Sequence, residues 1–155
     1  MTAARAGRAS ALGLALAATS LLGVVCSSAY GADSAPGEAP PLAQIHYMLH
    51  CQGCHLPDGR ESPGKVPALR DSIARYLTVA GGREYLVRVP GIAQAPVDDT
   101  ALAALLNWVV LRFGPASDAL AAAPFTAAEV AALRRPPLTD VTAVRDDLRR
   151  RLGPE

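Results

Sequence analysis

Two cysteines and a histidine lie close together in the stretch CQGCH, at Cys51, Cys54 and His55. On one turn of helix, residues three apart share a face with Cβ atoms about 5 to 6 Å apart, so both thiols can reach one edge of a flat ligand. The neighbouring imidazole then projects toward the centre of that ligand. This arrangement suits covalent attachment of a haem, with two thioethers to its vinyl groups and His55 on the iron.

Other uses of the motif fit less well. A disulfide between Cys51 and Cys54 would close a very short loop and gain little stability from chain entropy. A thioredoxin-type redox pair would need a βαβ context, which the sequence lacks. A zinc site would need further ligands, and His46 and His50 both lie upstream and crowd close to the cysteines. The motif therefore predicts one haem c, held by Cys51 and Cys54, with His55 as the metal ligand.

Residues 1–31 have the features of an export signal. Arg5 and Arg8 precede an apolar run over residues 11–26, and small residues follow it. The alternative is a retained anchor, but Thr19 and Ser20 interrupt the run, which is shorter than the roughly 18 to 20 uninterrupted apolar residues of a spanning helix. We expect cleavage, a mature protein without a stable membrane span, and a periplasmic or otherwise exported bacterial location. Export agrees with the motif, because bacteria attach haem c outside the cytoplasm.

Charge and length limit the remaining functions. The formal net charge is +1, and removing Arg5 and Arg8 with the signal changes it to −1, so we expect no nucleic-acid partner. A chain of 155 residues suits one compact domain with a modest extension.

The apolar pattern predicts an all-α fold. Residues 32–41 are a Pro/Ala-rich linker, and a helix over 41–53 carries the CxxC on its last turn. A short helix over 72–79 follows, the ambiguous segment 83–89 is assigned as helix, and a long apolar stripe marks a helix over 98–113 that Gly114 ends.

Residues 115–155 are predicted to form a C-terminal helical extension. Thr126 and Glu129 make a capping box for a helix to about Arg135, and Thr139 or Asp140 begins another to about Leu152. We expect their apolar faces to cover the domain formed by residues 42–114. The run 149–151 is interpreted as a solvated basic face, with docking of an acidic partner as the alternative.

The segment CQGCHLPDGRESPGKVPAL resembles the haem segment and the Gly-x-Val-Pro-x-Leu loop of the monohaem class I cytochrome c family. The resemblance implies a cytochrome c-like helical domain around one covalently bound haem. It also implies that the carbonyl of Pro67 accepts a hydrogen bond from His55, and that Trp108 packs where the first and last helices cross. It covers residues 42–113 and leaves the extension unexplained.

The sequence departs from that family on the other side of the haem. The family supplies a methionine, or less often a histidine, from a loop before the last helix, and this chain has neither after His55. We expect either an open or water-bound iron, or an unusual donor. The residues that bear on this question are Met48, His46 and His50 on the attachment helix, Lys65 close behind His55, and the possible donors Gln94, Asn107, Tyr76 and Tyr85.

The leading functional hypothesis is a non-enzymatic carrier of single electrons between redox partner proteins, such as a periplasmic dehydrogenase or a respiratory complex, and a downstream acceptor. The alternative is an open-site haem protein that binds or senses a small gas. A peroxidase-like role is weakest, because only Arg83, Arg88 or Glu84 could replace a distal acid or base.

Overall fold

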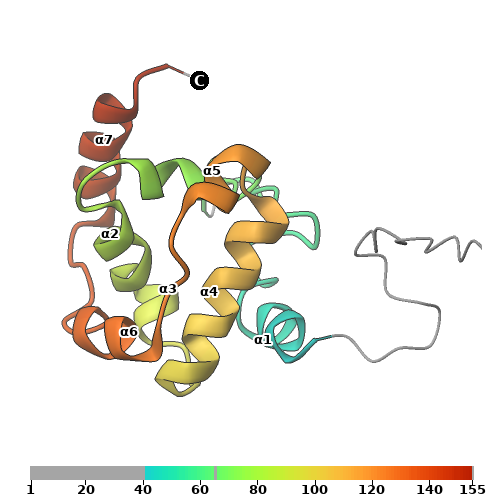
Figure 1. Ribbon diagram of the computed structural model, residues 1–155. Helices are drawn as coiled ribbons and strands as arrows, with labels where there is room; N and C mark the ends of the chain where they lie inside the picture. Colours follow the sequence, from blue (N-terminus) through green and yellow to red (C-terminus); the bar gives the residue numbers. More distant parts are fainter. Residues whose placement is uncertain (1–40, 65, 155) are drawn as a thin grey trace, which may run out of the picture. The chain divides into compact units, whose positions relative to one another are not determined.

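The computed structural model describes residues 41–64 and 66–154. The predicted signal peptide, all of the predicted linker except Pro41, and Lys65 lie outside the described residues. Helices joined by turns and loops make up the described part, which contains no β-strand and a single isolated bridge between His55 and Glu61. The all-α prediction is therefore confirmed. The helices are α1 (Leu42–His50), the 3-10 helix η1 (Ile73–Thr78), α2 (Gly82–Arg88), α3 (Pro90–Ala93), α4 (Asp99–Phe113), α5 (Ala116–Ala121), α6 (Ala127–Leu133) and α7 (Val141–Leu152) (Figure 1).

Helix α4 is the central element of the fold. Asp98 caps it by accepting a hydrogen bond from the backbone N–H of Ala101 at 2.7 Å, which satisfies one of the free donors of the first turn. It packs against α1 on one side and α6 on another (Figure 1). The apolar stripe of α4 is buried against these neighbours, as the long apolar pattern over residues 98–113 predicts. The buried stripe is Leu102, Leu105, Leu106, Val109, Val110 and Phe113.

An aromatic cluster holds α1 against α4. Tyr47 is fully buried, and its ring centroid lies 5.4 Å from that of Trp108 and 5.2 Å from that of Phe113. Trp108 meets Phe113 edge to face at 5.7 Å. Such tilted and edge-on pairs are the favoured geometries of aromatic rings. The predicted place of Trp108 at the crossing of these two helices is confirmed.

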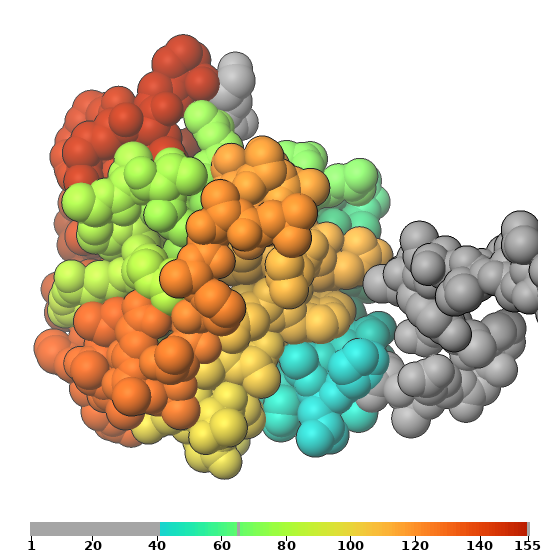
Figure 2. Space-filling view, in the orientation of Figure 1, coloured from blue at the N-terminus to red at the C-terminus, as the bar shows by residue number. Residues whose placement is uncertain are grey.

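The C-terminal extension shares the core of the rest of the chain. Val130 of α6 and Leu148 of α7 are at most 1% exposed and belong to the same apolar cluster as α2 and α4. Thr126 caps α6 and Asp140 caps α7, as their sequence positions predicted. Figure 2 shows α5 and α6, in orange, forming much of the surface in front of α4. The predicted cover of an apolar flank by the extension is thus present.

Three details of the helices differ from the sequence prediction. Helix α1 ends at His50, so Cys51 is its C-cap and Cys54 lies in the turn beyond it, not on the last helical turn. Helices α3 and α5 were not predicted, because each is shorter than two turns and shows no apolar period. Segment 73–78 is a 3-10 helix. None of the helices in the described ranges combines the length and apolar character needed to cross a bilayer.

Candidate functional site: the CxxCH segment and its cavity

The CxxCH segment is a chain of tight turns fastened to α1. The backbone N–H of Cys51 donates to the carbonyl of Tyr47 at 2.9 Å, and that of His55 donates to the carbonyl of Cys51 at 2.9 Å. The hydroxyl of Tyr47 donates to the carbonyl of Leu56 at 2.7 Å. These bonds continue a helical path past the end of α1. Cys51 and His55 are therefore still one turn apart, which preserves the spacing that attachment requires.

The two thiols are unpaired and one of them is sheltered. Neither Cys51 nor Cys54 is in a disulfide; Cys51 is half-buried and Cys54 is exposed. Burial, and then the neighbouring Cys54, raise the pKa of the Cys51 thiol to about 11. A redox-active pair needs a lowered pKa, since its working form is the thiolate. Within the described residues, no three or more His, Cys, Asp or Glu side chains gather as a metal site either. These observations favour covalent attachment over the alternatives.

Burial affects both the protonation and the hydrogen bonding of the His55 imidazole. Burial lowers its pKa below the usual value of 6.5, and the neutral imidazole is the form that binds metals. Its Nδ1 is buried and has no hydrogen-bond partner. A buried unpaired donor costs about 1 to 3 kcal/mol, and the resemblance assigns this N–H to the carbonyl of Pro67.

The hydrogen bond from His55 to Pro67 that the resemblance implied is not formed in this structure. Pro67 is exposed, and it lines a cavity instead of covering the imidazole. The role of Pro67 in holding the cofactor stays a prediction.

The loop after His55 is folded back on the motif. The N–H of Ser62 donates to the carbonyl of Cys54 at 3.2 Å, and the N–H of Leu56 to the carbonyl of Arg60 at 2.9 Å. Gly59 has a φ of +79°, and a Cβ built there would lie 2.6 Å from the ring of Phe113. The chain thus uses glycine both for the left-handed turn and for close contact with α4.

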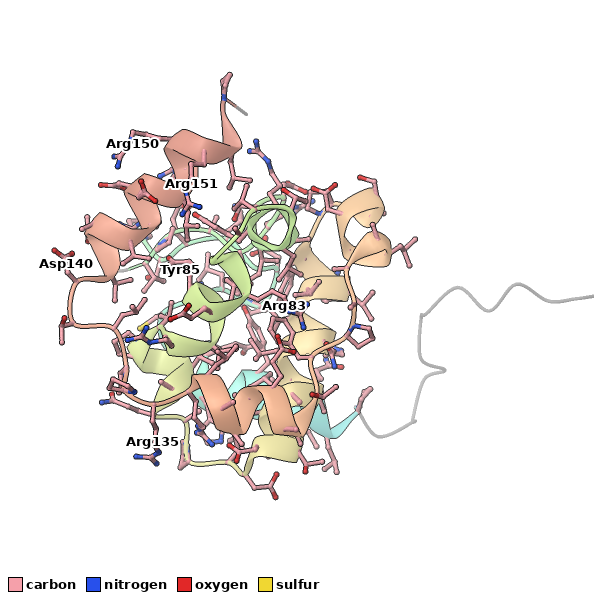
Figure 3. All side chains as sticks on the ribbon, turned by 60° about the vertical axis from the view of Figure 1, so that its left-hand side comes forward. Arg83, Tyr85, Arg135, Asp140, Arg150 and Arg151 are labelled. Atoms are coloured by element: carbon pink, nitrogen blue, oxygen red, sulfur yellow. The ribbon has the colours of Figure 1, made fainter. Side chains whose placement is uncertain are left out.

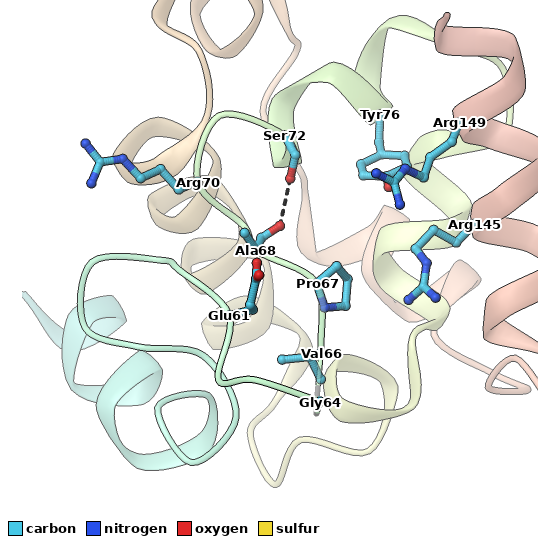
Figure 4. A pocket seen from close by; sticks show the side chains of 10 residues that line it. All are labelled: Glu61, Gly64, Val66, Pro67, Ala68, Arg70, Ser72, Tyr76, Arg145 and Arg149. Atoms are coloured by element: carbon cyan, nitrogen blue, oxygen red, sulfur yellow. Dashed lines mark hydrogen bonds between the residues drawn. The ribbon is translucent and has the colours of Figure 1, made fainter. Parts of the chain in front are cut away.

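A cavity of about 510 Å³ lies beside this loop (Figure 4). Cofactor pockets commonly enclose about 300 to 1,000 Å³. Glu61, on its wall, is paired through the backbone with His55, so the cavity adjoins the motif although no residue of CxxCH lines it. One wall is the segment 66–68 of the predicted Val-Pro loop. The lining residues are Glu61, Gly64, Val66, Pro67, Ala68, Arg70, Ser72, Tyr76, Arg145 and Arg149.

The contacts of Asn107 and Gln94 do not support either residue as an iron ligand. Both polar atoms of the Asn107 side chain are used by Phe125: Nδ2 donates to its carbonyl at 3.0 Å, and Oδ1 accepts from its N–H at 2.7 Å. Gln94 is exposed at the end of α3. Met48 is half-exposed on α1, where His46 and His50 stack with centroids 5.9 Å apart.

The two tyrosines lie nearer the cavity. Tyr76 lines it, and its ring centroid is 5.1 Å from that of Tyr85. Burial raises the pKa of the Tyr85 hydroxyl to about 12, so the phenol stays protonated at neutral pH. A protonated phenol is a poor iron ligand, and Tyr85 lies behind Tyr76, which forms part of the cavity wall.

A buried arginine that sequence reasoning missed holds the loop where the family's distal ligand would lie. Arg134, only 8% exposed, donates to the carbonyls of Ala93, Ala95 and Val97 at 3.0 to 3.3 Å. It also pairs with the Asp99 carboxylate at 2.7 Å. The loop from α3 to α4 is therefore bound to the extension. No sequence signal distinguishes Arg134 from its exposed neighbour in the chain.

The side chains considered for peroxidase-like chemistry are committed to structural contacts. Arg83 forms two hydrogen bonds of 2.7 Å to the carboxylate of Glu129 and lies 4.1 Å above the ring of Phe125 (Figure 3). Arg88 pairs with Glu84 one turn away and donates to the carbonyl of Pro136 at 2.9 Å. None of the three lines the cavity.

Comparison with known proteins agrees with this geometry. The chain is 33% identical over 121 residues to cytochrome c-552 of Thermus thermophilus, an alignment that covers 66% of this chain and 91% of that protein. It is equally similar to a second cytochrome c-552, from a defined strain of the same species, of which it covers 80%. No family model matches the chain. With this identity over most of the relatives' length, the chain belongs to the c-type cytochromes, a family of electron carriers that hold haem covalently.

Proposed function

We propose that this protein carries single electrons on one haem c, attached through thioethers to Cys51 and Cys54 and bound at the iron by His55. The observation that carries the proposal is the CxxCH segment itself. It combines two unpaired thiols with a neutral imidazole whose buried Nδ1 lacks a partner, and it adjoins a cavity of about 510 Å³. When bound, the haem supplies a reversible one-electron iron couple.

The chain's own residues hold and tune such a group. The tight turns after α1 keep Cys51 and His55 one helical turn apart, and the hydroxyl of Tyr47 fastens the following residue. The aromatic cluster between α1 and α4 keeps the attachment segment rigid and excludes water behind it. A rigid site keeps reorganisation small when the charge on the iron changes. We assign no catalytic step to any residue.

The proposed location is the periplasm or another exported compartment, and the proposed partners are redox proteins. The apolar run over residues 11–26 and its flanking arginines support export. A periplasmic dehydrogenase or a respiratory complex would donate the electron, and a downstream acceptor would remove it.

Expression with a cytochrome c maturation system, followed by intact mass and visible absorption, tests the proposal. The expected product is red, has the mass of the processed chain plus one haem, and shows a haem band that survives acid-acetone extraction. The double variant C51A/C54A should lose the extraction-resistant haem. A colourless wild-type protein with the mass of the bare processed chain would contradict the proposal.

A second candidate function is the binding of a small gas at an open iron position. It is favoured by the lack of any Met or His after His55 and by the attachment of loop 93–97 to Arg134. Losing a thioether ligand lowers the reduction potential and opens a coordination position. Addition of CO to the ferrous protein separates the two. An unchanged low-spin spectrum supports simple electron transfer, and immediate conversion to a CO complex supports ligand binding.

A further inference from the structure

Helix α7 of the C-terminal extension contributes two arginines to the cavity beside the motif. Arg145 and Arg149 are four residues apart on this helix, so they lie on one face of it. Figure 4 shows both side chains extending from α7 toward the cavity, with Pro67 on the opposite wall and Tyr76 close to Arg149. The cavity therefore has a basic wall from the extension and an apolar wall from residues 66–68.

These two arginines have no acidic partner among the described residues, unlike their neighbours on the same helix. Arg150 and Arg151 both pair with Asp147, at 3.2 Å and 2.8 Å. Figure 3 shows Arg150 and Arg151 toward the C-terminal end of α7. Glu61 also lines the cavity but forms no ion pair with Arg145 or Arg149. Within the described ranges, no ion pair neutralises Arg145 or Arg149.

One nitrogen of Arg145 lacks a hydrogen-bond acceptor. Its Nε is buried and has no hydrogen-bond partner, although the guanidinium also hydrogen-bonds the Tyr85 hydroxyl. A buried donor of a charged group without an acceptor is more costly than a neutral one. An anion with a planar carboxylate matches the guanidinium fork and would satisfy this donor.

We propose that Arg145 and Arg149 bind the two propionate carboxylates of the haem, so that helix α7 is part of the cofactor pocket. This inference rests on the proposed function. The ligand needs an apolar body, two carboxylates on one edge and a tether near His55. Residues 66–68 supply the apolar wall, α7 supplies the two cations, and the backbone pair of His55 with Glu61 places the cavity beside the motif. The extension thereby tunes the iron, because positive charge beside the carboxylates favours the ferrous state.

The test compares the reduction potentials of purified holoprotein variants R145Q, R149Q and R150Q. All three remove one positive charge from α7, and only the first two change the cavity. At a fixed electrode potential, R145Q should raise the ferric-to-ferrous ratio roughly tenfold, a potential lowered by about 59 mV for a one-electron couple. R149Q should shift the ratio in the same direction, and R150Q by less than about twofold. The propionate-bending band in the resonance Raman spectrum should also move in R145Q and R149Q alone.

The outcomes separate this inference from the proposed function. A colourless wild-type protein overturns the proposed function and the inference together. A haem-containing wild type whose R145Q and R149Q variants match R150Q overturns the inference alone. R145K keeps the charge and should return the ratio to within about twofold of wild type. If R145Q does not fold, the more exposed R149Q, compared with R150Q, decides the question.

Discussion

The attachment segment, residues 51–72, and the C-terminal extension, residues 116–152, satisfy their polar groups in opposite ways. The attachment segment contains no α-helix, and it leaves the Nδ1 of His55 buried without a partner. In the extension, side chains cap both α6 and α7, and Arg134 reaches three carbonyls and a carboxylate. Apart from the Nε of Arg145, no buried side-chain nitrogen or oxygen in the described part of the extension lacks a partner. The attachment segment keeps two unpaired thiols and a buried imidazole nitrogen without a partner.

The exception within the extension supports this distinction. Arg145 shares with His55 a buried nitrogen that lacks a partner, and both lie at or beside the same cavity. The remaining unsatisfied buried side-chain nitrogen in the described ranges belongs to His46, four residues before His50 on α1. Two of the three unsatisfied nitrogens therefore lie at or beside the cavity, whereas that of His46 does not.

The strongest test of the extension as a structural unit is R134M. Methionine keeps much of the volume and removes the donors to Ala93, Ala95 and Val97, as well as the partner of Asp99. Breaking a buried ion pair from one side costs about 3 to 5 kcal/mol, and we expect a loss near 3, because Asp99 is partly exposed. Urea unfolding of the holoprotein measures it. The exposed neighbour Arg135 is the control, with R135M within about 0.5 kcal/mol of wild type.

L148A tests whether the two regions share one core. Leu148 is 1% exposed, and truncating such a leucine costs about 3 kcal/mol through lost contacts and a cavity. Leu120, which is 79% exposed, provides the control L120A with a change within about 0.5 kcal/mol. The haem absorbance and the far-ultraviolet circular dichroism should change in one common unfolding transition. Separate transitions would show that the extension folds independently of the attachment segment.

G59A measures how firmly the attachment segment is held to α4. The new methyl group meets the Phe113 ring, and the positive φ adds strain, so we expect a loss of about 2 kcal/mol. Gly64 has a φ of +74° and no atom within 4 Å of the corresponding Cβ, so G64A carries the backbone strain alone. The difference between the two variants in thermal unfolding isolates the packing contact. Equal losses would mean that Gly59 is needed only for its turn.

The smallest loss of stability is expected for E129Q, which changes the contact between the extension and α2. The hydrogen bond from Arg83 is the main cause that lowers the pKa of Glu129 below its ordinary 4.5. A carboxylate with a depressed folded-state pKa stabilises the fold above pH 4.5 and loses that contribution as the pH falls through the lower, folded value. E129Q should cost about 1 kcal/mol at pH 7.

The pH dependence supplies the control for E129Q. The stability gap between E129Q and wild type should close as the pH falls below 4.5, since glutamine cannot be protonated. D147N removes the acidic partner of two exposed arginines and should cost at most about 0.5 kcal/mol. If the difference in stability between E129Q and wild type stayed constant across this pH range, the effect of E129Q would come from packing and not from charge.

The sequence predicted the helices that have a full apolar stripe or a side-chain cap. Helix α4 and the starts of α6 and α7 follow from local pattern, because Asp98, Thr126 and Asp140 each satisfy a free N–H of their own first turn. The position of Trp108 at the crossing came from the family resemblance. The end of α1 was placed three residues too late, at Gly53, whereas the helix ends at His50 with Cys51 as its C-cap.

The contacts between residues far apart in the sequence could not be predicted in the same way. Arg83 reaches Glu129 across 46 positions of sequence, and Arg134 reaches Ala93 across 41. The basic run at 149–151 is exposed, as predicted, but nothing in the sequence placed Arg149 at the cavity. An arginine looks the same in sequence whether it pairs within its own turn, clamps a distant loop or faces a cavity.

By itself the sequence determined the chemistry of attachment, because two thiols and an imidazole within one turn are a local arrangement that needs no tertiary partner. It also determined the all-α class, through helical spacing of apolar residues. Only the tertiary structure decided which polar groups are satisfied. Hydrogen bonds and ion pairs between distant residues depend on packing, and packing leaves His55 and Arg145 with buried nitrogens at the cavity while completing Arg134 and Asn107 elsewhere.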